Sequence, residues 1–477
     1  MELLFESRLE IRGVEGKLYF IRAQPTFHPE PVLEPDPNSL VDVGGVSCFG
    51  TVLHDGGKYR MWYQAWPRDW DGRNAQLVGY AESNDGIAWQ RPLLGLVEFG
   101  NRPNNLCNLG MHSPSVFIDP QAPGSHRYRA TGWAEAGSPV ADQVGAERGY
   151  YTAHSTDGLH WTLDAATPRW PSSDVIMSIY HPQQQRGIAA LKYTPRYLNI
   201  PRRSIWTAEL RDGVWSAAHS ALIPDEFDDV CAMARGFASG DYYGMGMMPA
   251  GSGTVGFIWQ FRHTLPRTAG RQSGVFGTMD VSLAYQAQPG DRWLHLPGRQ
   301  DFMSHRTFTW DRGGIYTASG TVAVGKEQRI YFCGALESHG WYVDDRWQIQ
   351  EKWKQKLIEG GLDRVGFAYW PADRLFGFRA DPEGVLELNL GLIDQPSTLA
   401  LNYTTLPGGS VRVELPARDG HALADAVPLT GDQIQRIAAW QGGERILPIP
   451  DQPLIVRLHL ERAEVYAYEL SDESHQP

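Results

Sequence analysis

A short hairpin signal returns along this chain, and its repetition constrains the fold more than any other feature. Ser83 to Trp89 reads Ser-Asn-Asp-Gly-Ile-Ala-Trp, and Ser155 to Trp161 reads Ser-Thr-Asp-Gly-Leu-His-Trp. Shorter versions follow at Arg211 to Trp215 and at Pro289 to Trp293, each after a run with strand character. Because glycine tolerates the positive φ of tight hairpin turns, Asp-Gly between two such runs predicts a β-hairpin. A hairpin that recurs at long intervals predicts a propeller, a solenoid or another repeat array.

A second repeat supplies the number of units. It reads as a turn that opens into a buried strand, and its five copies are Gly57 to Tyr63, His126 to Gly132, Gln185 to Leu191, Gly240 to Gly246 and Gln328 to Gly334. A further hairpin follows each copy, which makes four strands per unit. The intervals between units are uneven, as expected when loops on one face carry function. The sequence therefore predicts an all-β fold with a five-bladed β-propeller.

Three regions of the 477 residues differ in composition and in the pattern of their strand-like runs. Residues 1–40 are Pro-rich from Pro25 to Pro37 and predict an N-terminal arm that packs across the propeller, whose blades occupy residues 41–380. Residues 381–477 alternate short strand-like runs with Pro and Gly turns, which predicts a C-terminal β-sandwich. One helix is expected, from Trp341 to Gly361, where apolar residues recur near helical spacing.

Charge and composition exclude several classes of protein. The 43 Lys and Arg against 55 Asp and Glu give a net charge of −12 without a basic stripe, so we expect neither nucleic acid nor a membrane as a partner. No run approaches the roughly 18 apolar residues of a membrane span, and the first residues lack the pattern of a secretory signal. The four cysteines have no zinc-site spacing, so we expect a cytoplasmic protein without a metal or other cofactor.

Acidic residues recur where the first strand of each blade is expected to begin. In a propeller, this strand starts at the mouth of the central channel and the next strand returns there, so side chains at both ends converge. The expected starts carry Asp42, the stretch 105–113 with His112, Asp174, Asp228-Asp229 and Asp311, and the ends of returning strands carry Trp66, Trp133, Glu135, Lys192, Glu337 and His339. We therefore expect one pocket with several carboxylates and aromatic rings.

Such a ring of carboxylates fits glycosidic bond cleavage. Like charges raise each other's pKa, and the reaction needs one protonated carboxyl for the leaving oxygen and one ionised carboxyl to attack or to activate water. The catalytic candidates are Asp42 as nucleophile or base, Asp174 as acid or its partner, and Asp229, which binds hydroxyls or tunes a pKa as Asp311 does. The alternative for each single position is a turn residue whose carboxylate bonds the local backbone.

The 17 Trp and 20 Tyr exceed the needs of a generic core and predict exposed platforms for a ring-shaped ligand. The substrate-binding candidates are Trp66, His112, Trp133, Arg203, Trp310, Asp311, Glu337 and His339, and among them the three tryptophans are expected to stack on the sugar. His112 and His339 fit equally well as hydrogen-bonded wall residues. A structural calcium ion in the channel is a further alternative.

Several motifs together resemble the five-bladed β-propeller glycoside hydrolases, the invertase-like and arabinanase-like enzymes of families 32 and 43. They are Gly57 to Tyr63, Tyr80 to Trp89, Leu94 to Phe99 with Asn104-Asn105, Asp280 to Tyr285, Trp310-Asp311 and His339-Gly340. The resemblance implies a bacterial glycosidase with a carbohydrate substrate. It places Asp42 where the family has its nucleophile or base, within Val41 to Gly45, and Asp174 on the blade that carries the proton donor.

The expected function is hydrolysis of a small glycoside or oligosaccharide, with furanosides among the candidates. Two other readings stay open: a non-catalytic glycan-binding propeller, and a glycoside phosphorylase that would use Arg196, Arg202 and Arg203 for phosphate. The sequence leaves the oligomeric state open as well.

Overall fold

The computed structural model describes residues 1–5, 7–70, 75–137, 144–145, 147–171, 174–268, 274–342, 355 and 361–472. Nearly all regular structure in these residues is β, which confirms the all-β prediction, and α1 (Glu226–Met233) is a short α-helix among the strands. None of the described helical segments is long and apolar enough to cross a bilayer. The helix expected from Trp341 to Gly361 falls on a segment of which only residues 341, 342, 355 and 361 are described, so it stays a prediction.

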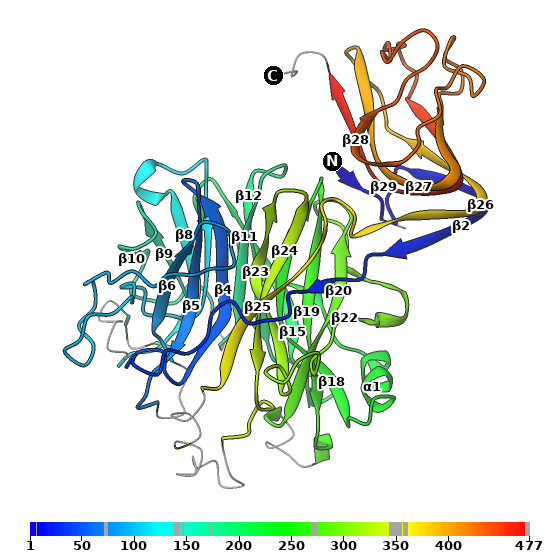
Figure 1. Ribbon diagram of the computed structural model, residues 1–477. Helices are drawn as coiled ribbons and strands as arrows, with labels where there is room; N and C mark the ends of the chain where they lie inside the picture. Colours follow the sequence, from blue (N-terminus) through cyan, green and yellow to red (C-terminus); the bar gives the residue numbers. More distant parts are fainter. Residues whose placement is uncertain are drawn as a thin grey trace.

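Most strands form five antiparallel groups that lie side by side (Figure 1). The first group is β4 (Gly45–Asp55), β5 (Lys58–Trp66) and β6 (Val78–Ser83); the second is β7 (His112–Ile118), β8 (Tyr128–Ala134), β9 (Gly149–Ser155) and β10 (Thr162–Leu163). The third is β11 (Ile176–His181), β12 (Arg186–Tyr193), β15 (Ser204–Arg211), β16 (Val214–Trp215) and β17 (His219–Leu222), flanked by a small hairpin of β13 (Arg196–Tyr197) and β14 (Ile200–Pro201).

The fourth and fifth groups share one sheet. The fourth is β18 (Ser239–Ala250), β19 (Gly253–His263), β20 (Gly277–Gln286), β21 (Leu294–His295) and β22 (Asp301–Met303); the fifth is β23 (Gly314–Val324), β24 (Glu327–Ala335), β25 (Asp363–Pro371) and β3 (Thr26–Phe27). A single parallel pair, Met279 with Gly314, joins the two groups. Within each group the strands are antiparallel, as the repeats predicted.

The first strands of the five groups contact one another in a cycle, β4 to β7 to β11 to β18 to β23 and back to β4. Buried hydroxyls link neighbours in this cycle: the Val116 amide donates to Thr51 Oγ1 at 2.8 Å, and Thr51 lies 2.6 Å from Ser319 Oγ. The Ser178 amide likewise donates to Ser115 Oγ at 2.6 Å. These contacts satisfy polar groups that would be costly to bury unpaired.

Two of the Asp-Gly turns each fix one group to a neighbour. The carbonyl of Gly158, in the turn after β9, accepts a hydrogen bond from Trp62 Nε1 on β5 at 2.7 Å. The carbonyl of Gly86, in the turn after β6, accepts one from the Tyr331 hydroxyl on β24 at 2.7 Å. The second group is thus joined to the first, and the first to the fifth.

The fourth copy of the second repeat was assigned to the wrong strand. Gly240 to Gly246 was expected to open a returning strand, but it lies in β18, the first strand of its group. Its glycines are there because neighbours approach closely: a Cβ at Gly244 would lie 2.6 Å from Trp259, and one at Gly246 would lie 2.4 Å from the Ala318 carbonyl oxygen. Close packing, rather than a turn, produced the pattern.

The strand expected after Asp228-Asp229 is also wrong, because this segment forms α1. Asp225 caps the helix by accepting hydrogen bonds from the amides of Phe227 and Asp228, at 2.9 and 3.3 Å. Asp228 returns the contact by accepting from the Asp225 amide at 3.0 Å. This reciprocal cap satisfies amides that have no partner inside the helix, and it makes Asp229 a helical residue rather than a strand start.

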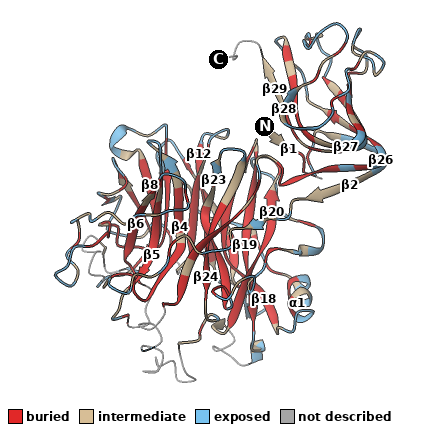
Figure 2. Ribbon diagram, in the orientation of Figure 1, coloured by how far each residue is buried: buried red, intermediate tan, exposed pale blue. Residues whose placement is uncertain are grey.

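A separate six-stranded sheet holds the C-terminal region, at the upper right of Figure 1. Its path is β2 (Ile11–Arg22), β26 (Phe376–Asn389), β29 (Ile455–Asp472), β27 (Ser397–Glu414) and β28 (Asp432–Ile437), with β1 (Glu2–Leu3) on β29. The short strands expected here are parts of long strands with register shifts, and Figure 2 shows their alternating burial. The arm residues supply β1 and β2; the sandwich and the domain boundaries stay predictions.

The contact between Gly158 and Trp62 predicts a measurable loss of stability. Gly158 has a φ of 79°, and a Cβ there would lie 2.8 Å from Trp62 Cζ2, so Gly158→Ala adds a steric clash to the backbone strain. Gly56 has a φ of 60° with nothing near, so Gly56→Ala carries only the strain. In urea unfolding we expect Gly56→Ala to cost about 1 kcal/mol and Gly158→Ala about 3 kcal/mol. Equal costs would contradict the role of this contact.

Candidate functional site

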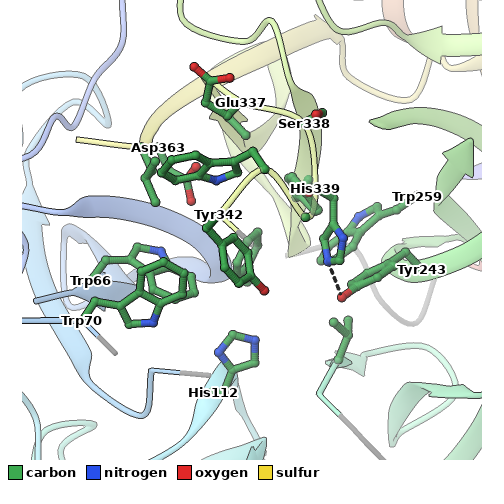
Figure 3. A pocket seen from close by; sticks show the side chains of 17 residues that line it. Trp66, Trp70, His112, Tyr243, Trp259, Glu337, Ser338, His339, Tyr342 and Asp363 are labelled. Carbon is green, nitrogen blue, oxygen red and sulfur yellow. Dashed lines mark hydrogen bonds between the residues drawn. The ribbon is translucent and has the colours of Figure 1, made fainter. Parts of the chain in front are cut away.

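A cavity lies at the end of the five groups where β7 and β11 begin. It encloses about 740 Å³, part of which is open to solvent. Figure 3 shows its lining, which comprises Phe49, Trp66, Trp70, His112, Val175, Tyr243, Trp259, Tyr316, Ala335, Glu337, Ser338, His339, Gly340, Trp341, Tyr342, Leu362 and Asp363. These residues come from all five groups, so no single hairpin could form the site.

Aromatic rings make up much of the wall. Trp66 and Trp70 meet edge to face with their ring centroids 5.2 Å apart, and Tyr342 packs edge to face on Trp70 at 4.9 Å. On the other side, Trp259 lies edge to face on Tyr316 at 5.5 Å. Flat apolar faces beside polar groups suit the C–H faces and hydroxyls of a sugar ring.

Asp363, the first residue of β25, is a carboxyl that holds its proton more tightly than usual. It lies against β4, where the Ser47 hydroxyl donates to Asp363 Oδ2 while accepting from Trp66 Nε1 at 2.7 Å. Burial raises the pKa of Asp363 to about 6, although hydrogen bonds from Ser47, Cys333 and Trp66 and the charge of Arg364 act in the opposite direction. A carboxyl with such a pKa can donate a proton near neutral pH.

Asp174 borders the cavity next to Val175 and has the opposite charge behaviour. Burial acts to raise the pKa of Asp174, but the Lys192 ammonium, in direct contact with Oδ1, outweighs it and leaves that pKa below its ordinary value. Asp174 therefore stays ionised, and its side chain keeps one fifth of its exposure. Its φ of 75° is unusual for a residue with a side chain. Backbone strain of this kind often occurs near functional sites.

Tyr243 connects Asp174 to His339. His339 Nδ1 is within hydrogen-bond distance of the Val275 carbonyl, which can only accept, so Nδ1 carries the hydrogen and Nε2 is the acceptor. The Tyr243 hydroxyl, 2.9 Å from Nε2, consequently donates to His339. The same hydroxyl lies 3.4 Å from Asp174 Oδ2, but it has a single proton and donates that proton to His339. Oδ2 can thus still accept a proton.

Both histidines of the cavity are neutral at physiological pH. Burial lowers the pKa of His112 and that of His339 to about 4 each. His112 Nδ1 lies 3.1 Å from the Ala75 carbonyl, which fixes its ring in the wall. The two rings supply hydrogen-bonding atoms without charge, as neutral sugar hydroxyls require.

The structure brings part of the predicted site together. Trp66, His112, Glu337 and His339 line the cavity, and Asp174 borders it. The Arg203 guanidinium lies 5.1 Å from the centroid of the Tyr243 ring, just behind the wall. All of these roles stay predictions, but the residues are gathered at one place, as expected from strand ends that converge.

Asp42 and Asp229 lie outside the cavity lining, each in ion pairs. Asp42 is 0 % exposed; its Oδ2 accepts from the Tyr63 hydroxyl at 2.8 Å and pairs with Arg91 at 2.9 Å. Asp229 pairs with Arg202 at 3.2 Å. Their catalytic roles stay predictions, and neither carboxylate faces the space where the aromatic rings converge.

The other three candidates are packed away from the cavity. Trp133 belongs to a buried cluster with Tyr150. Trp310 is stacked between Phe308 and Phe332, at centroid distances of 5.2 and 5.6 Å. Asp311 is 0 % exposed and accepts from the amide of Phe308 at 2.9 Å, which is the turn role that was the alternative for such aspartates.

Sequence reasoning missed Asp363, Trp70 and Tyr243. Asp363 begins a buried strand, but that strand is the third of its group, whereas acids were sought only at the starts of first strands and the ends of second strands. Tyr243 was hidden in the misassigned Gly240 to Gly246 segment. Trp70 lies a few residues beyond the end of β5, and the repeats gave no signal for it.

No group of three or more His, Cys, Asp or Glu side chains in the described part of the chain is arranged to hold a metal ion. The calcium ion and the absence of a cofactor both stay predictions.

No family model matches this chain, and no curated protein does. Solved structures similar to it include a glycosyl hydrolase from Bacteroides ovatus, at 13% identity over 74% of this chain and 95% of that one, with a TM-score of 0.46. A structure from a study of glycoside hydrolases in the GH130 family of mannoside phosphorylases has the same identity, coverage and TM-score. A thermostable family-43 glycoside hydrolase matches at 12% identity over 64% of this chain and 88% of its own, with a TM-score of 0.42. The chemistry of this chain has to be argued from its own side chains.

The raised pKa of Asp363 predicts a pH-dependent stability. Between its ordinary pKa of 3.8 and its folded pKa of about 6, the folded state keeps a proton that the unfolded state releases. The free energy of unfolding therefore falls as pH rises through this window, by about 3 kcal/mol at 1.36 kcal/mol per unit. Asp363→Asn removes the titrating group. From pH 4 to pH 7, the free energy of unfolding of this variant, measured in urea relative to that of the wild type, should therefore rise by about this much.

Asp55→Asn is the matched control for this experiment. Hydrogen bonds from Arg127 and Tyr128 lower the pKa of Asp55 to about 2, so its stabilising effect is present above the ordinary pKa and is lost only at more acidic pH. The difference between Asp55→Asn and the wild type should stay flat from about pH 5 to pH 7. A flat difference for Asp363→Asn as well would contradict the raised pKa.

Proposed function

We propose that this protein is a glycoside hydrolase built on a five-bladed β-propeller, with the five strand groups as its blades. One observation carries the proposal: two carboxyl groups with opposite pKa shifts, Asp363 and Asp174, at one cavity with aromatic walls. Environments that push two carboxyl pKa values apart are what acid and base roles in glycoside cleavage require. The substrate is a small glycoside or oligosaccharide, with furanosides among the candidates.

In the proposed reaction Asp363 is the general acid and Asp174 is the base. As the bond between the anomeric carbon and the glycosidic oxygen breaks, Asp363 gives its proton to the departing oxygen. A water molecule forms the new bond to the anomeric carbon and gives its proton to Asp174 Oδ2. Lys192 holds Oδ1 of Asp174, and the hydrogen bond from Tyr243 to His339 leaves Oδ2 free to accept.

Phosphorolysis is the second candidate, because two cations lie beside Asp174. Lys192 Nζ is 3.8 Å from the centroid of the Tyr243 ring, and Arg203 is 5.1 Å from the same centroid. Arg202 pairs with Asp229 and Asp241, none of which lines the cavity. A phosphate ion near Lys192 and Arg203 would take the place of the attacking water.

The first test is turnover of a panel of para-nitrophenyl glycosides and of the matching methyl glycosides, with and without phosphate. Asp174→Asn should lower kcat about 10²- to 10⁴-fold on both kinds of substrate. Asp363→Asn should lower it by a similar factor on methyl glycosides but far less on nitrophenyl glycosides, because nitrophenolate leaves without a proton. Wild-type kcat/KM should fall as pH rises above about 6, where Asp363 loses its proton.

Glu387→Gln, on the C-terminal sheet, is the control variant and should leave turnover unchanged. Turnover that requires phosphate would favour the phosphorylase. Sugar binding without any turnover across the panel would favour the glycan-binding alternative. Activity that survives in both Asp363→Asn and Asp174→Asn but is lost in Asp42→Asn would overturn this assignment and favour the one expected from sequence.

A further inference from the structure

A second cavity of about 660 Å³ lies between the second and third groups, at the opposite end of their strands. Its lining comprises Asp119, Gln121, Ala122, Pro123, Arg129, Tyr180, Gln185, Arg186, Gly187, Leu210, Asp212 and Gly213. β7 begins at His112 in the first cavity and ends at Ile118, just before Asp119. At about 3.3 Å per residue, roughly 20 Å of strand separates the two cavities. The second cavity is therefore a separate site.

Arg129 marks this cavity as unusual. Its side chain is nine-tenths buried, and the structure gives its guanidinium no hydrogen bond; Nε is a buried donor without a partner. Asp119 Oδ2, 3.5 Å from Nε, forms an ion pair with the guanidinium but is too far for a good hydrogen bond. A buried guanidinium whose donors are unused is costly, so a partner in the cavity would stabilise it.

The arginines at the equivalent places in other groups show what is missing. Arg60 on β5 donates from Nη2 to the Asp157 carbonyl of the neighbouring Asp-Gly turn at 2.7 Å. Arg329 on β24 donates to the Asp85 carbonyl in the same way at 3.1 Å. Each lies two residues before the aromatic ring that bonds the glycine of that turn, Trp62 and Tyr331 respectively.

In the second group the equivalent hydrogen bond is not formed. Arg129 again faces the Asp-Gly turn of the next group, and a Cβ at Gly213 would lie 3.7 Å from its Nη2. That turn is the shortened copy of the repeat, a tight hairpin in which Arg211 pairs with Val214. Thr131 stands where the aromatic ring would be. The turn packs beside the guanidinium without forming the hydrogen bond seen in the other groups, and both line the cavity.

The charges around the cavity indicate the kind of ligand. Arg129 supplies unused donors, while Asp119 and Asp212 bring negative charge to the lining. Arg186, the other cation of the lining, already pairs with Glu209. An anion would meet these carboxylates, whereas a neutral polyol both accepts from a guanidinium and donates to a carboxylate. The ring of Tyr180 offers a face for the C–H groups of such a ligand.

We propose that this second cavity is a binding site for a neutral sugar residue, separate from the proposed catalytic cavity. Arg129 donates to ring or hydroxyl oxygens, Asp119 accepts from hydroxyls, and Gln121 and Gln185, whose side chains bond each other at 3.2 Å, lie at the rim. The site does not depend on the reaction at the other end, so an inactive protein would still bind there.

The test is hydrogen–deuterium exchange of the full chain with free D-glucose, D-galactose, D-mannose or L-arabinose, because exchange reports each cavity locally. At least one sugar should protect peptides that span residues 117–130 and 180–188, and sarcosine at the same concentration should not. Arg129→Gln should weaken the apparent affinity about tenfold or more, the loss expected for hydrogen bonds to a charged group. Gln121→Trp, which fills the rim and leaves Arg129 in place, should abolish the protection.

Protection by inorganic phosphate instead of sugars would overturn the proposal in favour of an anion site. Protection that persists in both variants, or no protection by any sugar, would overturn it as well; in the latter case the guanidinium is bonded by water alone. Loss of turnover plays no part in this readout, so failure of the proposed hydrolase activity and failure of this site are distinguishable.

Discussion

The hydrogen bonds from aromatic side chains to the glycine carbonyls of neighbouring turns are the contacts on which this architecture depends. Trp62 reaches the turn of the second group, and Tyr331 on the fifth group reaches the turn of the first. The second of these joins two residues that lie 245 positions apart in the chain. Bonds of this range cost chain entropy to form, and they close the cycle that the first strands make along their buried faces.

The closure also sets the chemistry of the cavity. Asp363 belongs to the fifth group, and Ser47 and Trp66, which hold its carboxyl, belong to the first. The carboxyl is buried because the two groups meet there, and that burial raises its pKa. Asp174, on the third group, has instead a lysine from its own group to keep it ionised. Closing the cycle therefore raises the pKa of Asp363, while the pKa of Asp174 is set within the third group.

Sequence reasoning succeeded where the determining interactions are local. The Asp-Gly hairpins follow from glycine conformation and from carboxylates that bond nearby amides, as Asp85 does with Ile87 and Ala88 at 2.8 Å. It failed where a residue's role depends on packing between groups: Gly244 and Gly246 resembled turn glycines but make room for Trp259 and Ala318. Asp363 was missed for the same reason, because burial raises its pKa and that burial depends on packing against β4, where Ser47 lies 316 residues earlier in the chain.

Repetition also explains why the imperfect copies are informative. Where the turn is complete, its carbonyls satisfy an arginine and an aromatic side chain of the neighbouring group, and the space between groups is filled. Where the turn is shortened, at Asp212-Gly213, the arginine stays and its donors face a cavity. Arg129 keeps only a long ion pair with Asp119, whose Oδ2 lies 3.5 Å from Nε, and its unused donors are what the proposed ligand would satisfy.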